Sequence, residues 1–131
     1  MVWSSVYETG NKVIDDEHKE MFMLVKAVLD AAFESRKEKI DTSVKFLSDY
    51  VVRHFEHEEE LADECGYPDA SIHKKQHQDF LKTVATLKEK VAREGDVMDV
   101  SLAVNDTVVA WLTEHIMGSD KLLADYYKEW K

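Results

Sequence analysis

Residues 40–65 read IDTSVKFLSDYVVRHFEHEEELADEC, and their side chains form one stripe at steps of three and four. That spacing places the stripe on one face of an α-helix. The stripe consists of Ile40, Val44, Leu47, Val51, His54, Glu58, Leu61 and Cys65. The breaker Gly66-Tyr67-Pro68 follows directly. The stretch therefore predicts a long helix that ends before proline, which cannot continue a helix.

Three further stretches show the same helical spacing. The first carries His18, Phe22, Val25, Leu29 and Ala32. Another is expected to end near Gly95 and carries His73, His77, Phe80, Val84, Leu87 and Val91. The last carries Val104, Val108, Trp111 and His115, is disturbed at Gly118, and resumes with Leu123 and Tyr127. Four such helices with short connections predict an all-α, up-down-up-down four-helix bundle.

Length and composition agree with a small helical protein. The chain has 131 residues, which suits one domain over 1–131, with an arm at about 1–14 and the bundle at about 15–131. It contains one proline and four glycines, and its formal charge is −10, which disfavours nucleic-acid and anionic-membrane partners. Residues 1–12 lack the pattern of a signal peptide, and the single cysteine, Cys65, fits a reducing compartment. We therefore expect a cytoplasmic protein.

Polar residues interrupt these stripes at positions where an apolar side chain is expected. They are His18, His54, Glu58, His73, His77 and His115. A buried histidine or carboxylate without a partner costs several kcal/mol, so something must compensate for all six. In an up-down-up-down bundle the start of one helix lies beside the end of the next. All six residues are therefore expected in one layer at one end of the bundle.

Asp120 can join this layer only if its helix is distorted. It follows His115 by five positions, which separates the two by about 140° around a regular helix. Gly118 lies between them and could permit the distortion. The neighbouring acidic residues have a simpler interpretation. The run Asp15-Asp16-Glu17 is read as helix N-terminal charge, and Glu56, Glu59 and Glu60 as a solvated acidic face. His57 points about 100° away from Glu58 and is read as a surface residue.

Each of these motifs alone is weak evidence for a metal site. A His-x-x-x-Glu pair is more often a surface pair on a helix, and a single histidine is more often a satisfied core or surface residue. Together, five imidazoles and two carboxylates exceed what one tetrahedral zinc ion takes, and calcium and magnesium prefer oxygen ligands. The set suits a pair of iron ions, with zinc, manganese and cobalt left open. The sequence contains no Glu-x-x-His motif of carboxylate-rich di-iron bundles. A histidine-rich shell favours holding oxygen over splitting it.

The chain resembles the hemerythrin family, specifically its single-domain bacterial members, the bacteriohemerythrins. The resemblance covers nearly the whole chain and is carried by Asp15-Asp16-Glu17-His18, His54-Phe55-Glu56-His57-Glu58-Glu59, Tyr67-Pro68, His73-Lys74-Lys75-Gln76-His77 with Phe80, and Trp111-Leu112-Thr113-Glu114-His115-Ile116-Met117-Gly118-Ser119-Asp120. Two positions depart from the family pattern. Ala62 stands where methionine is frequent, and Met21 stands where leucine is common.

The resemblance implies two iron ions (Fe2+/Fe3+) with a bridging oxo or hydroxo group, held by His18, His54, Glu58, His73, His77, His115 and Asp120. Three histidines, His73, His77 and His115, would bind one iron, and the other two would bind the second. Glu58 and Asp120 would bridge the pair. An apolar oxygen pocket would be lined by Met21, Phe55, Trp111, Leu112 and Ile116, which also have the character of ordinary core.

The implied function is reversible binding of molecular oxygen, as a carrier, store or sensor. The alternative is an enzyme, a di-iron peroxidase acting on hydrogen peroxide or nitric oxide. No general acid stands out near the pocket residues, which favours binding over catalysis. No oligomeric state is assigned.

Overall fold

A computed structural model describes residues 3–34, 37–94 and 103–131. A 3-10 turn, η1 (Ser5–Tyr7), precedes three long helices, α1 (Lys12–Phe33), α2 (Lys37–Cys65) and α3 (Ala70–Glu94). The last helix is continuous but changes in pitch, and it consists of η2 (Val104–Val109), α5 (Ala110–His115), η3 (Ile116–Asp120) and α6 (Lys121–Trp130). The expected helix end near Gly95 lies outside the described residues.

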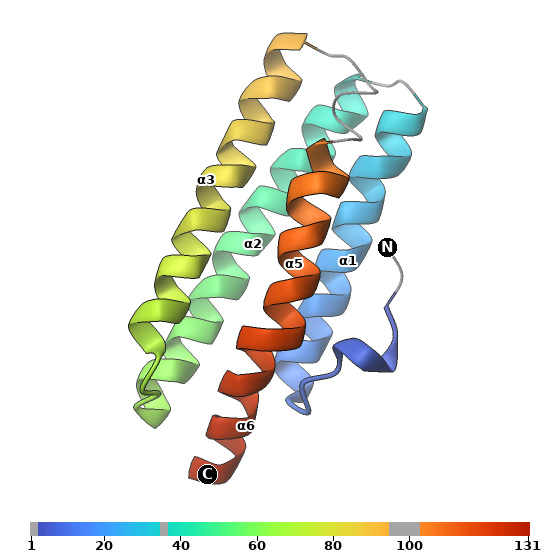
Figure 1. The fold of residues 1–131 in the computed structure, drawn as a ribbon. Coiled ribbons are helices and arrows are strands. Elements are labelled where there is room, and N and C mark those ends of the chain that lie inside the picture. The colour runs from blue at the N-terminus through green and yellow to red at the C-terminus, as the bar shows by residue number, and fades with distance from the viewer. Residues whose placement is uncertain (1–2, 35–36, 95–102) are drawn as a thin grey trace.

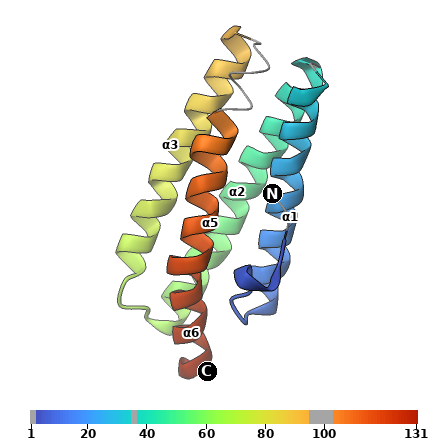
Figure 2. The same ribbon diagram turned by 45° about the vertical axis from the view of Figure 1, so that its right-hand side comes forward.

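The helices run in alternating directions and form a four-helix bundle (Figure 1). α2 packs against both α1 and α3, and the last helix contacts all three through η2 and α6 (Figure 2). The predicted all-α bundle is thereby confirmed, while the division into an arm and a bundle stays a prediction. Within the described ranges, no helix combines the length and the apolar character needed to cross a membrane.

Local sequence explains where the helices near the site begin and end. The Asn11 side chain caps α1 by accepting a hydrogen bond from the Ile14 backbone nitrogen at 3.1 Å. α2 ends because Gly66 adopts a φ of +62°, a left-handed conformation that glycine adopts without steric cost. The Tyr67 nitrogen then donates to the Ala62 carbonyl at 2.9 Å, which closes the end of the helix.

The apolar stripes meet in one continuous core. Val25, Leu47, Val51 and Val108 have fully buried side chains in this core, and Phe80 is 1% exposed. The core fills the bundle between the polar layer and the opposite end. Most of the predicted stripes therefore pack in the core, as their spacing predicted. Leu29, Leu61, Trp111 and Tyr127 are only partly buried, and their neighbours Val28, Ala62 and Leu112 are buried instead.

We expect Leu47→Ala to lower the free energy of unfolding by about 2 to 5 kcal/mol, because it leaves a cavity in the close-packed core. Leu47 is fully buried, whereas the adjacent Phe46 is 59% exposed. Phe46→Ala serves as the control and should change stability by no more than about 0.5 kcal/mol. Urea denaturation followed by circular dichroism measures both. Equal losses of unfolding free energy in the two variants would contradict burial of Leu47 in the core.

Candidate metal centre

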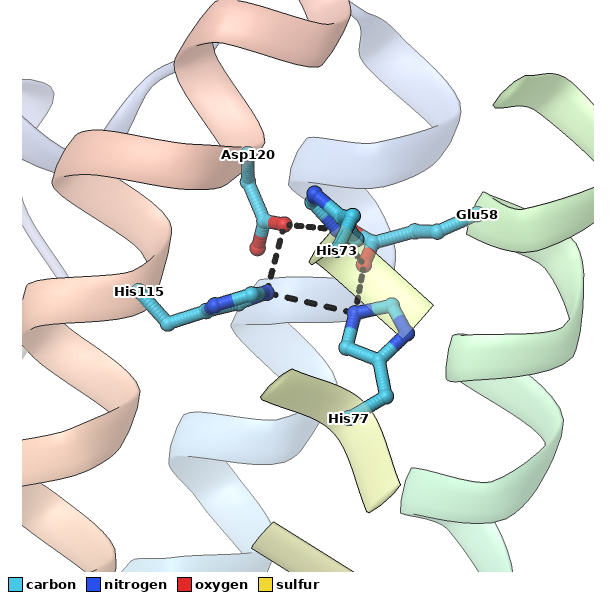
Figure 3. Close-up of side chains that lie close together, drawn as sticks. All are labelled: Glu58, His73, His77, His115 and Asp120. Carbon is cyan, nitrogen blue, oxygen red and sulfur yellow. Dashed lines mark hydrogen bonds and ion pairs between the residues drawn. The ribbon is translucent and has the colours of Figure 1, made fainter. Parts of the chain in front are cut away.

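Seven polar side chains from all four helices meet in one buried layer. α1 supplies His18, α2 supplies His54 and Glu58, α3 supplies His73 and His77, α5 supplies His115, and η3 supplies Asp120. Each of the seven is at most 5% exposed. Figure 3 shows five of them facing one another from three helices. The structure therefore brings together every residue that the sequence placed in this layer.

The turn that carries Asp120 is widened. η3, Ile116–Asp120, is a π-helical segment, in which the backbone bonds residues five apart. Asp120 therefore returns to the face of His115, and its Oδ1 lies 3.0 Å from the His115 Nε2. The distortion predicted between these two residues is confirmed. The suggested role of Gly118 is not supported, because its φ lies outside the left-handed region and a Cβ added there would meet nothing within 4 Å.

The Glu58 carboxylate divides its two oxygens between two groups of histidines. Its Oε2 lies 3.4 Å from the His18 Nε2 and 3.1 Å from the His54 Nε2. Its Oε1 lies 3.4 Å from the His73 Nε2 and 3.0 Å from the His77 Nε2. One carboxylate thus joins the α1 and α2 histidines to the α3 histidines.

Asp120 makes the same division from the opposite side. Its Oδ2 lies 3.0 Å from the His18 Nε2, and its Oδ1 lies 3.1 Å from the His73 Nε2. Two overlapping sets of candidate ligands result, and the ligand atoms of each set lie within 4.8 Å of one another. The larger set is Glu58, His73, His77, His115 and Asp120, and the smaller is His18, His54, Glu58 and Asp120.

Several polar atoms in the layer remain unsatisfied by the protein. Within the described part of the chain, the His54 Nε2, the Glu58 Oε2, the Asp120 Oδ1 and both ring nitrogens of His18 have no hydrogen-bond partner. They lie close to oppositely charged groups but are not aligned as donor and acceptor. Each such atom costs about 1–3 kcal/mol when buried. Cations held between the imidazoles and carboxylates would satisfy them, and imidazole with carboxylate suits transition metals.

The carboxylates make three of the histidines more basic despite their burial. Burial opposes protonation of His54, but the nearby Glu58 charge and the hydrogen bond with Glu17 outweigh it and raise the His54 pKa to about 10. In the same way, burial opposes protonation of His73, but its contacts with Asp120 and Glu58 outweigh burial and raise the His73 pKa to about 9. The His18 pKa is raised for the same reason. Without metal, the His54 and His73 rings therefore carry protons at neutral pH.

The two central carboxylates are ionised. Burial opposes ionisation of Glu58, but the His54 charge and the close approach of the His18 and His54 rings hold the Glu58 pKa well below its usual value. Burial and the Glu58 charge oppose ionisation of Asp120, and His115 and His18 outweigh them, so the Asp120 pKa is also lowered. Two negative charges therefore lie at the centre of the layer, where they would attract metal cations that displace the protons of the surrounding imidazoles.

Two carboxylates outside the layer contact its histidines, and the sequence did not reveal their role. Glu17 accepts a hydrogen bond from the His54 Nδ1 at 3.2 Å, and the Glu59 Oε2 lies 3.4 Å from the His77 Nδ1. Their side chains are 16% and 27% exposed. The reading of Glu17 as helix N-terminal charge is therefore wrong, since it lies beyond the first turn of α1 and contacts His54, and Glu59 is only partly solvated. Neither residue belongs to an apolar stripe, so spacing offered no signal. His57 is 54% exposed, as expected.

Aromatic rings pack directly on the histidines. The Phe55 ring stacks on His77 with centroids 3.8 Å apart, and Trp111 stacks on His115 at 4.3 Å. Phe55 joins Met21, Leu112 and Ile116 in the buried core cluster, and Trp111 is partly buried against it. The proposed pocket residues thus lie in one apolar cluster beside the layer. Trp111 and His115 also line a surface cavity of about 180 Å³.

The fold and the layer define a helical-bundle protein with a histidine and carboxylate metal-binding cluster. The chain belongs to the hemerythrin family, because the family model described as Hemerythrin HHE cation binding domain matches residues 9–127. It is 36% identical over 126 residues to the bacteriohemerythrin of Methylococcus capsulatus, covering 93% of this chain and 92% of the relative.

Further relatives agree. The bacteriohemerythrin of Stenotrophomonas maltophilia is 30% identical over 128 residues, covering 98% of this chain and 82% of the relative. A hemerythrin-like protein of Naegleria gruberi is 33% identical over 118 residues, covering 90% and 86%. A crystal structure of wild-type hemerythrin superposes with a TM-score of 0.83 at 31% identity and covers 97% of both chains. The resemblance drawn from the motifs is thus confirmed.

Metal binding to the metal-free protein at pH 7 should release at least two protons per chain. The His54 pKa of about 10 and the His73 pKa of about 9 keep both rings protonated at pH 7, and a metal ligand must be unprotonated. Metal affinity should therefore rise with pH up to about these values. Calorimetric titration in buffers with different ionisation enthalpies counts the protons. A binding enthalpy that does not depend on the buffer would contradict this expectation.

Proposed function

We propose that this chain binds molecular oxygen reversibly at a di-iron centre held by His18, His54, Glu58, His73, His77, His115 and Asp120. The observation that supports this most strongly is the division of the carboxylate oxygens. Glu58 and Asp120 each present one oxygen to the α1 side and the other to the α3 side. Such carboxylates can bridge two metal ions.

The two metal positions would differ in their protein ligands. One would have three histidines and both carboxylates, and the other would have His18, His54 and both carboxylates. The second position therefore has one protein ligand fewer and is the one where a small ligand can bind. Two iron ions held there would supply the electron pair and the open coordination position that reversible oxygen binding needs.

The apolar side chains beside the layer are proposed to keep water and protons away from this open position. Met21, Leu112 and Ile116 are at most 1% exposed. The five imidazoles are neutral when they bind metal, so the ligand shell carries little negative charge. Such a shell stabilises highly oxidised iron poorly, which favours holding oxygen intact over splitting it.

Reduction without oxygen, followed by exposure to oxygen and purging with inert gas, tests this function. We expect a visible absorption band that appears with oxygen and disappears on purging, through repeated cycles, in a sample that contains two irons per chain. Irreversible bleaching together with turnover of added hydrogen peroxide would instead indicate the peroxidase. Absence of any oxygen-dependent band in the iron-loaded protein would contradict oxygen binding.

His77→Ala should lower the iron content sharply, because the His77 Nε2 lies 3.0 Å from Glu58 within the larger ligand set. Lys75→Ala is the matched control on α3, since the Lys75 side chain is 75% exposed. Metal analysis of both purified proteins, with circular dichroism to verify folding, gives the result. An unchanged iron content in folded His77→Ala would remove His77 from the site.

Leu112→Ser should shorten the lifetime of the oxygenated protein several-fold, because a hydroxyl in the apolar cluster admits water and protons near the bound ligand. Leu112 is 1% exposed, whereas Leu122 on the same helix is 62% exposed. Leu122→Ser is therefore the control and should behave like the wild type. The decay of the oxygen-dependent absorption band measures the lifetime. Identical decay in the two variants would argue against a protective role for Leu112.

A further inference from the structure

One carboxylate outside the layer is shared by a buried and an exposed histidine. The Glu17 Oε1 lies 3.2 Å from the Nδ1 of His54, which is fully buried. The Glu17 Oε2 lies 2.6 Å from the Nδ1 of His57, which is 54% exposed. Each carboxylate oxygen therefore has its own imidazole, and a line of contacts leads from the protein surface to a candidate metal ligand.

The chemistry of this arrangement determines which nitrogen of His54 faces the metal. An ionised carboxylate only accepts hydrogen bonds, so the proton of neutral His54 must be on Nδ1. The His54 Nε2, 3.1 Å from Glu58, is then free to bind a metal. A carboxylate that accepts a hydrogen bond from one nitrogen of a metal-binding histidine also makes the other nitrogen a stronger electron donor to the metal.

The two metal positions differ in this outer support. On the α1 side, His54 has the Glu17 carboxylate behind its Nδ1. The His18 Nδ1 has no hydrogen-bond partner in the described part of the chain, so His54 alone has this support there. On the α3 side, Glu59 approaches His77 at 3.4 Å, and no second imidazole among the described residues holds Glu59 in place. The shared carboxylate is thus specific to the position with fewer ligands.

We infer that Glu17 and His57 form an outer clamp that holds His54 in its ligating orientation and slows loss of the metal ion beside His18 and His54. His57 acts through Glu17, because it hydrogen bonds the oxygen that would otherwise turn toward solvent. Both are positioning residues. The inference rests on the proposed di-iron function, since it requires two metal positions of unequal stability.

The test follows iron loss from the reduced, fully loaded protein to a coloured ferrous chelator without oxygen. The wild type should lose its two irons in two phases, with the faster phase from the position that has four protein ligands. Glu17→Leu should accelerate the fast phase by about 10- to 100-fold, the range in which loss of such an outer partner weakens metal binding. His57→Leu should accelerate it by about three- to tenfold, which corresponds to one hydrogen bond.

A double mutant separates the clamp from a general loss of stability. If His57 acts through Glu17, then His57→Leu in a Glu17→Leu background should add nothing to the effect of Glu17→Leu alone. His57→Gln retains a side-chain amide that can donate to Glu17 and should restore a rate near that of the wild type. Acceleration by His57→Leu in both backgrounds would overturn the inference.

Two controls locate the effect. Glu56→Leu places a leucine on the same exposed turn of α2 and should leave both phases unchanged. Glu59→Leu removes the carboxylate behind His77 and should accelerate the slow phase instead. If the wild type shows two phases but His57→Leu changes neither, the clamp is wrong and the di-iron proposal stands. A wild type that binds fewer than two irons would overturn the proposed function and the clamp together.

Discussion

Two ionised carboxylates are enclosed at the centre of this bundle, and the rest of the structure is arranged to make their burial tolerable. Glu58 and Asp120 are at most 1% exposed. A buried charge without a partner is strongly destabilising, so imidazoles from every helix surround these two. The histidines do not fully compensate by themselves, because three of their nitrogens and one oxygen of each carboxylate have no hydrogen-bond partner within the described part of the chain. The layer is therefore complete only with bound cations, which is the physical basis of its assignment as a metal centre.

This requirement explains the irregular geometry of the last helix. A regular helix would turn Asp120 away from His115, and the layer would lose one of the two carboxylates that contact both groups of histidines. The widened turn of η3 returns Asp120 to the helix face that carries His115. Beside it, the Ser119 hydroxyl donates a hydrogen bond to the Gln76 side chain of α3 at 2.8 Å. Distorted turns of this kind are frequent at functional sites. The apolar core on one side of the layer supplies the stability that an irregular polar site cannot.

The carboxylates at the centre of the layer and those nearer the surface contact the histidines in different ways. The carboxylates at the centre are shared by both groups of histidines, and a further pair, Glu17 and Glu59, supports the outer nitrogens of His54 and His77. Aromatic rings stack on His77 and His115 and limit their rotation. The α3 side therefore has more candidate ligands and more stacking. The α1 side has fewer candidate ligands, and its His54 contacts a carboxylate that also contacts a surface histidine.

Much of this organisation could be predicted from residue spacing alone. The stripes of residues 40–65 and their counterparts predict four helices, because helical periodicity is a local property of the chain. Antiparallel order then predicts that His18, His54 and His115 share one end. Spacing along one helix does not specify how far each helix rotates about its axis or which rotamer each side chain adopts. The phase of Asp120, the division of the Glu58 oxygens and the two partners of Glu17 depend on those variables, so packing between helices was needed to establish them.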